Sequence, residues 1–247
     1  MRRAVHQFLI LCTALMMSSV AVAQDRGPVL ATIQQIPYSF IDKNGREAGY
    51  LYDVAKAILR EAGYVDDVQM LPLKRMQNEL QRGDVSFGIL ASTPYVVKHY
   101  DVVEPLGLNL DAGVLPRAGV EVYSYEDLMG LRIATPFGLK INDRFDNDST
   151  LSKFETKDYN QSTIIMKRGR VDAIAGGVES ITYNARINGY DVDGMFGTPL
   201  IFQDYEIALI KQKKFSDEKV IDRLRIAVRR LRDAGVFKEI HADFIKN

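Results

Sequence analysis

The stretch VQMLPLKRMQNELQRGDVSFGIL, residues 68–90, carries the first evidence of the fold class. Val68–Leu71 predicts a short strand, Lys74–Arg82 predicts a helix that ends at Gly83, and Val85–Leu90 predicts a largely buried strand. Strands that alternate with helices in this way form a mainly parallel sheet with helices on both faces. Ligands of such sheets bind outside the carboxyl ends of the strands. The sequence therefore predicts an α/β protein with its site at that edge.

The same alternation extends in both directions from this stretch. Upstream, Val29–Ile33 predicts a strand, and Asp53–Ala62 predicts an amphipathic helix with Asp53 as its N-cap and Gly63 at its end. Downstream, a second round of helices and strands is expected at Glu126–Leu128, Leu131–Thr135, Ser162–Arg168, Val171–Ala175 and Ser180–Ile187. The tail predicts a final helix around Ile221, Leu224 and Val228 that stops at Gly235.

The first residues have the pattern of a secretory signal peptide. Arg2 and Arg3 precede an apolar run over 8–17, and Ala21-Val22-Ala23 supplies a small-residue cleavage site. A membrane anchor is the alternative, but about ten apolar residues are too few to cross roughly 30 Å of hydrocarbon. We expect residues 1–23 to be removed after Ala23, which places the mature protein in the periplasm.

Composition argues against several classes of site and partner. The only cysteine, Cys12, lies inside the predicted signal peptide, so the mature chain is expected to hold no disulfide and no cysteine-based metal site. Positive charge forms no stripe and the net charge is +0, which speaks against nucleic acid as a partner. The acidic residues Asp143, Asp146 and Asp148 lack the glycine and terminal glutamate of an EF-hand and are expected in a solvated loop. No metal and no cofactor is expected.

Five segments stand in a telling order along the chain. They are PYSFIDKNG at 37–45 followed by Gly49-Tyr50, LQRGDV at 80–85, EDLMG at 126–130, GRVDA at 169–173, and the closing segment 231–244 with Gly235 and Ile240. Together they resemble the bacterial extracellular solute-binding proteins of family 3, the periplasmic partners of polar amino-acid importers.

The resemblance implies a two-lobed periplasmic binding protein-like fold of type II, in which two strands cross between α/β lobes. The crossings are expected near Pro105–Asp111 and Pro199–Tyr205. The first lobe would then be discontinuous, 28–106 plus 205–247, and the second lobe would be 107–204, including the hinge segments. Closure of the lobes about a hinge is the implied motion.

The resemblance also points to ligand-binding positions, and three of them are altered in this chain. An aromatic ring of the family falls at Gln35, with Tyr38 and Phe40 as the nearest rings; core packing is preferred for Phe40 and is an even alternative for Tyr38. The arginine that clamps a ligand carboxylate falls at Val96, and the acid that receives the α-amino group falls at Gly177. Glu179 is the nearest carboxylate, although a helix N-terminus also favours an acid there.

Positive charge for a ligand has other sources in the sequence, namely Lys74, Arg75, Lys98, His99 and Lys140. Arg75 is preferred because it opens a helix at the carboxyl end of a strand, with a surface salt bridge as the equal alternative. Ser92, Thr93 and the backbone amides from Gly138, beside Phe137, are expected to add hydrogen bonds to an anionic group.

These features predict a monomeric solute-binding protein that delivers a small polar molecule to a membrane permease of the ABC type. Because both ends of the usual amino-acid grip are missing, the ligand is expected not to be a standard α-amino acid. One alternative is a periplasmic enzyme resembling cyclohexadienyl dehydratases, whose acid or base would be Glu179, His99 or Lys140. Another is a degenerate scaffold, or the partner of a separate sensor.

Overall fold

The structure, a computed structural model, describes residues 27–246, so the predicted signal peptide lies outside the described residues. Eight strands form one sheet in the order β4-β1-β5-β10-β6-β9-β7-β8. Their bounds are β1 Leu30–Ile33, β4 Val68–Leu71, β5 Phe87–Ala91, β6 Tyr100–Pro116, β7 Arg132–Pro136, β8 Ser152–Thr156, β9 Ala173–Gly177 and β10 Leu200–Gln212. A small hairpin pairs β2 (Phe40–Ile41) with β3 (Glu47–Ala48).

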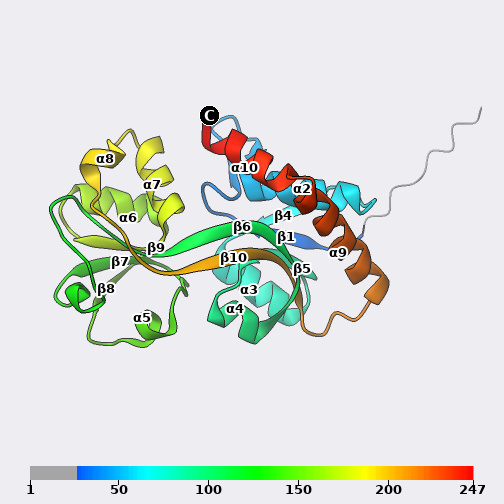
Figure 1. The fold of residues 1–247 in the computed structure, drawn as a ribbon, viewed down its shortest axis with the longest axis horizontal. Helices are drawn as coiled ribbons and strands as arrows, with labels where there is room; N and C mark the ends of the chain where they lie inside the picture. The colour runs from blue at the N-terminus through cyan, green and yellow to red at the C-terminus, as the bar shows by residue number, and fades with distance from the viewer. Residues whose placement is uncertain (1–26, 247) are drawn as a thin grey trace, which may run out of the picture.

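Helices cover the two ends of this sheet (Figure 1). Around β4, β1 and β5 lie α2 (Tyr50–Glu61), α3 (Leu73–Arg82), α4 (Pro94–His99), α9 (Glu218–Asp233) and α10 (Val236–Lys246). Around β9, β7 and β8 lie η2 (Glu126–Leu128), α5 (Asp143–Asn147), α6 (Tyr159–Lys167), α7 (Val178–Ile187) and α8 (Val192–Met195). We call these two parts the first lobe and the second lobe.

Within each lobe the neighbouring strands pair in parallel, as β1 does with β4 and β5, and β7 with β8 and β9. The long strands β6 and β10 pair antiparallel and run from one lobe into the other. The predicted α/β class, with mainly parallel pairing and two crossing strands, is confirmed. The exact lobe boundaries stay a prediction, since Leu108 packs in the core of the first lobe and Tyr205 in that of the second.

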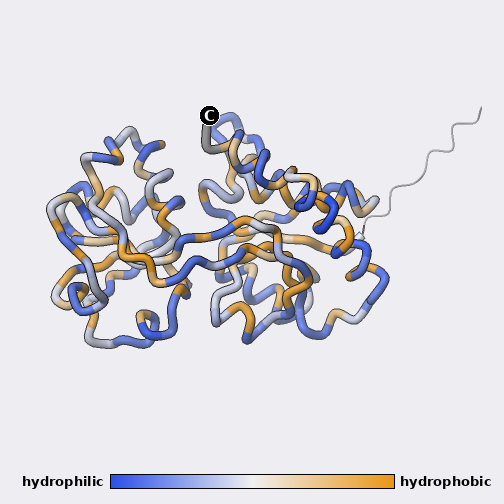
Figure 2. The backbone as a smooth tube through the Cα atoms, viewed as in Figure 1, coloured by the Kyte–Doolittle hydropathy of each residue, from blue (hydrophilic) through white to orange (hydrophobic). Residues whose placement is uncertain are grey.

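Where β6 and β10 cross, their hydropathy changes. Figure 2 shows hydrophilic colour at the waist between the lobes, where Asn109 and Asp111 of β6 lie beside Glu206 and Asp204 of β10. Asn109 Nδ2 donates a hydrogen bond of 2.7 Å to Asp204 Oδ2. Two backbone strands with polar side chains therefore bridge two separate apolar cores, the arrangement of a hinge.

The predicted N-cap of α2 is wrong. The helix begins at Tyr50 after Gly49, so that Asp53 lies within its first turn. No side chain caps this helix; instead the Tyr38 carbonyl accepts the amides of Leu51 (2.9 Å) and Tyr52 (3.2 Å). A contact between distant residues has satisfied the donors that a local cap would have taken.

Of two further local predictions, one is confirmed and one is wrong. The helix predicted at 74–82 is confirmed and ends at Gly83, which adopts the left-handed conformation common for a glycine at the end of a helix. The acidic stretch expected as a loop instead forms α5, capped by the Asn142 side chain. No helix among residues 27–246 has the length and apolar character needed to cross a membrane.

Candidate functional site

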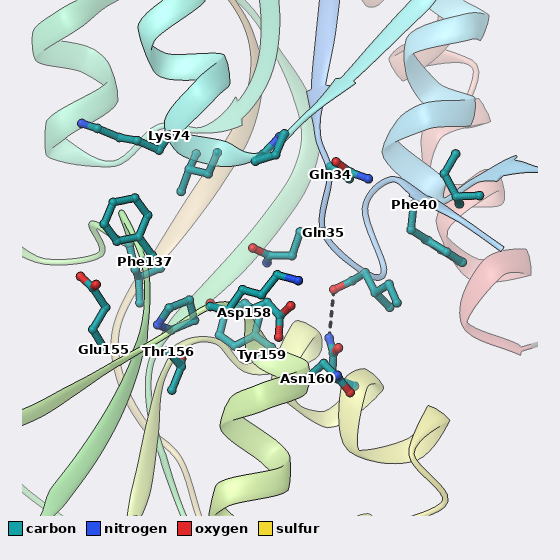
Figure 3. Close-up of a pocket in the computed structure, with 18 residues that line it drawn as sticks. Gln34, Gln35, Phe40, Lys74, Phe137, Glu155, Thr156, Asp158, Tyr159 and Asn160 are labelled. Carbon is teal, nitrogen blue, oxygen red and sulfur yellow. Dashed lines mark hydrogen bonds between the residues drawn. The ribbon is translucent and has the colours of Figure 1, made fainter. Parts of the chain in front are cut away.

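Two cavities lie where the lobes face each other. The larger one, about 760 Å³, we call the outer cleft; charged residues of both signs line it, namely Lys74, Glu155, Lys157 and Asp158. The smaller one, about 90 Å³, we call the inner pocket; it shares Gln35, Leu73, Leu139 and Tyr159 with the outer cleft. Figure 3 shows Gln35 between residues of the first lobe (Lys74, Gln34) and residues of the second (Glu155, Tyr159, Asn160).

Side chains from both lobes form the inner pocket. The first lobe contributes Ile33, Gln35, Tyr38, Leu51, Leu73, Ile89, Leu90, Ala91, Thr93, Val96 and Ile207, and the second contributes Leu139, Ile141, Tyr159 and Gly177, with Leu110 from the crossing strand. Several of these residues follow the carboxyl ends of strands, the edge that the sheet topology predicts for a site. None of these lining residues, all within the described part of the chain, carries a charge.

The structure brings Tyr38 and Gly177, two of the predicted residues, into contact. Tyr38 is only 3% exposed, and a Cβ built on Gly177 would lie 3.1 Å from its hydroxyl. Burial raises the pKa of Tyr38 above its usual range, the nearby Tyr159 adds to this rise, and Ser180 partly offsets it. The Tyr38 hydroxyl makes no hydrogen bond of normal geometry with the described residues. It is therefore a buried, protonated O–H group beside the pocket.

Gln35, predicted at the family's aromatic position, reaches across the lobes. Its Nε2 lies 3.5 Å from Ser180 Oγ, and Asn184 Nδ2 donates to the Ile36 carbonyl at 3.2 Å. Gln35 and Ile36 belong to the loop after β1, whereas Ser180 and Asn184 belong to α7, so these two hydrogen bonds join the first lobe to the second. The lobes are thus in contact in this structure.

Glu179 lies on the hinge side of Tyr38, away from the inner pocket. It lines a separate cavity of about 310 Å³ with Asn109, Asp111 and Gly177. His241 Nε2 of α10 lies 3.1 Å from Glu179 Oε2, and this hydrogen bond raises the pKa of His241, against the opposing effect of burial. Glu179 Oε1 is buried without a hydrogen-bond partner among the described residues. The predicted acid has an imidazole partner that the sequence did not indicate.

The preferred cation, Arg75, lies outside both cavities. Its side chain is 67% exposed and its Nε donates to Glu79 Oε1 at 2.6 Å, one turn along α3. This is the surface salt bridge that the sequence left as the alternative. Its neighbour Lys74 lines the outer cleft instead.

Ser92 and Thr93 both follow β5, but they have different roles. Thr93 is buried, lines the inner pocket, and its hydroxyl accepts the Val96 amide at the start of α4. Ser92 lines neither cavity, and its backbone amide donates a hydrogen bond to the backbone carbonyl of Glu206.

Phe137, Gly138 and Lys140 gather in a side cavity of about 410 Å³ next to the outer cleft. Phe137 is 54% exposed at its rim, and Gly138 faces Lys74 of the first lobe, whose Cβ lies 3.7 Å from a Cβ built there. Lys140 is exposed and lines this side cavity, not the inner pocket. These three residues therefore line the side cavity and not the inner pocket.

Sequence reasoning missed three residues of this region, namely Tyr159, Asn184 and His241. The Tyr159 hydroxyl accepts the Gly177 amide at 3.0 Å, and it lies where a Cβ on Gly176 would collide. The signal in the sequence was the pair Gly176-Gly177 at the end of a strand, because glycines there mark a close approach of other atoms. For Asn184 and His241 no local signal exists. Among residues 27–246, no group of three or more metal-binding side chains occurs.

Comparison with known proteins agrees with this geometry. Residues 29–247 match the family model described as bacterial extracellular solute-binding proteins, family 3. A search of curated proteins found no match.

Solved structures with the same fold have low sequence identity. A histidine kinase sensor domain with similarity to periplasmic binding proteins has a TM-score of 0.73 at 17% identity, over 90% of this chain and 96% of that chain. A periplasmic binding protein of Salmonella typhimurium with high arginine specificity has a TM-score of 0.71 at 17% identity, over 88% and 98%. An ancestral amino acid-binding protein, a precursor of cyclohexadienyl dehydratase, has a TM-score of 0.68 at 18% identity, over 89% and 95%.

Proposed function

Because the chain belongs to the bacterial extracellular solute-binding proteins of family 3, we propose that it captures a small polar solute between its lobes. In this proposal the cleft closes by rotation about β6 and β10, and the loaded protein docks as a monomer on the permease of an ABC-type importer. The lobes are 28–106 plus 205–247 and 107–204. The mature protein works in the periplasm after cleavage behind Ala23, so N-terminal sequencing of the secreted protein should begin at Gln24.

We further propose that the solute is not a standard α-amino acid. The observation that carries this is the inner pocket without charge. Val96, where the family's arginine would stand, is 5% exposed and packs in the apolar core of the first lobe. A branched apolar side chain offers a carboxylate no hydrogen bond, and glycine at 177 offers an ammonium group no counter-charge.

The enzyme alternative has one observation in its favour. Glu179 and His241 form an acid and base pair of the kind that elimination chemistry needs. Of this pair only Glu179 lines a cavity, the hinge-side one; neither residue lines the inner pocket, and Tyr38 lies between the two cavities. We therefore propose binding without turnover.

The test is to purify the mature protein from a periplasmic extract and to measure its native mass before and after mild unfolding. Thermal shifts are then recorded with pooled amino acids, organic acids, amines, amides and prephenate-like compounds. A released small molecule or a raised melting temperature is the expected result, since a ligand at 100 times its Kd adds about 2.7 kcal/mol. Conversion of a pooled compound would make the protein an enzyme. No bound mass and no shift would favour a scaffold with a degenerate cleft.

A further inference from the structure

The inner pocket is unusual for a site that must recognise a polar solute, because its polar groups are few and all neutral. Only Gln35, Tyr38, Thr93 and Tyr159 bring polar side chains to its wall. Two of them already have partners, since Thr93 caps α4 and Tyr159 accepts the Gly177 amide. Gln35 has only the long 3.5 Å contact of its Nε2 with Ser180 Oγ, so the bonding capacity of Gln35 and Tyr38 is the least used.

The hydroxyl of Tyr38 interacts with Ser180 but does not use its full capacity for hydrogen bonds. Its side chain is almost fully buried, yet its hydroxyl has no hydrogen-bond partner of normal geometry among the described residues. Buried polar groups in folded proteins nearly always have a partner, and an exception calls for an explanation. A ligand oxygen in the pocket supplies one, because a neutral phenol hydroxyl can donate a hydrogen bond.

The position of Tyr38 also explains why the family's acid is missing. A Cβ on Gly177 would lie 3.1 Å from the Tyr38 hydroxyl and 2.9 Å from Leu110 Cδ1. A side chain at 177 would therefore crowd the Tyr38 hydroxyl and the end of the Leu110 side chain. In this chain a neutral phenol stands beside the position of an anion.

Charged groups occur only at the borders of this pocket. Lys74 and Lys140 are exposed and line the side cavity, and Glu179 is paired with His241 on the hinge side. A charged ligand group that entered the pocket would lose its water without gaining a counter-ion, which is strongly unfavourable. A neutral polar group loses much less hydration free energy on entering the pocket, and one hydrogen bond to the protein compensates for that loss.

On the basis of the proposed function, we infer that the inner pocket selects a small uncharged ligand whose amide, carbonyl or hydroxyl oxygen accepts a hydrogen bond from Tyr38. Gln35, with both a donor and an acceptor, holds the other polar atom of such a group. The apolar wall, formed by residues such as Ile89, Leu90 and Leu139, receives its hydrocarbon part.

Two matched sets of probes test this inference by calorimetry. One set is 4-methylpentanamide, 4-methylpentanoate, 3-methylbutylamine and leucine, and the other is 3-phenylpropanamide, 3-phenylpropanoate, 2-phenylethylamine and phenylalanine. Within each set the apolar part is kept while the charge changes. We expect the amide of at least one set to bind about tenfold or more tightly than its charged counterparts.

Variants then assign the effect to Tyr38. Tyr38→Phe removes only the hydroxyl and should weaken amide binding about tenfold with little change in the melting temperature, because the hydroxyl makes no hydrogen bond of normal geometry with the described residues. Tyr100→Phe is the matched control. That buried hydroxyl donates to the Gln77 carbonyl at 3.1 Å, outside the pocket, so its loss should lower the melting temperature and leave amide binding unchanged.

The outcomes separate this inference from the proposed function. An acid, amine or amino acid that binds as tightly as its amide overturns the inference, as does a charged native ligand, while solute binding itself stands. Failure of both amides also overturns it. If the extracted protein in addition carries no ligand and shows no shift with any pool, the proposed function fails as well.

Discussion

His241 Nε2 of α10 lies 3.1 Å from Glu179 Oε2 of α7, and this bond joins the last helix of the first lobe to the second lobe. Aromatic contacts surround it: Tyr50 meets His241 edge to face at 4.7 Å between centroids, and Tyr183 stacks on Phe244 at 5.5 Å. The C-terminal helix is thus part of the contact between the lobes.

This pair predicts a pH dependence of stability. The folded pKa of His241 is raised, mainly by its hydrogen bond to Glu179, so its contribution is fully present below the unfolded value of about 6.5. It is lost as pH rises through the raised folded pKa. Urea unfolding at pH 6 and pH 9 should therefore show a gap between wild type and His241→Gln that shrinks at the higher pH. A gap of equal size at both pH values would contradict this assignment.

A buried carboxylate in β6 should matter for stability. Glu104 is 7% exposed and accepts from Arg229 Nε at 2.9 Å and Arg232 Nη1 at 2.7 Å. Glu104→Gln should lower the free energy of unfolding by about 1–3 kcal/mol, because hydrogen bonds to charged groups are the strong ones. Glu61→Gln is the control. It removes an exposed ion pair with Arg230, which lies on α9 like Arg229 and Arg232, and should cost less than about 1 kcal/mol of stability. Equal losses in denaturant titrations would refute the argument.

Gly49 holds the start of α2 against Tyr38. Its φ is 122°, and a Cβ there would lie 2.3 Å from the Tyr38 carbonyl oxygen. Gly49→Ala should cost about 2–4 kcal/mol and disturb ligand binding, since it displaces the loop that carries Tyr38. Gly45→Ala shares a positive φ of 77° but meets no atom within 4 Å, and should cost only about 1–2 kcal/mol. Thermal unfolding of both variants compares the two effects.

Arg75 is expected not to bind the solute. Its partner is Glu79 and neither cavity includes it, so Arg75→Ala should leave the Kd of the released ligand or of the amide probe within about twofold. Tyr38→Phe in the same assay shows that the measurement detects a lost contact. A tenfold loss in Arg75→Ala would mean that the side chain swings into the cleft when ligand binds.

Much of the fold was readable from local patterns. The helix α3 and the strands beside it follow from apolar spacing and from Gly83, and the order of five short segments was enough to identify the family. Such features depend on residues close in sequence, so periodicity and turn chemistry suffice to find them. That Val96 and Gly177 stand at the family's arginine and acid positions stays a prediction, which rests on the resemblance.

The site depended on contacts between distant residues. Tyr38 caps α2 with its carbonyl and faces Gly177, 139 positions onward, with its hydroxyl, and neither role shows in its neighbours. Arg75 was a candidate because it follows a strand, but in α3 its side chain pairs with Glu79, one turn further along the helix. Glu179 pairs with His241 only because α10 and α7 meet in the folded protein. Charge and burial at a site follow from how two lobes meet, and only the tertiary structure specifies that meeting.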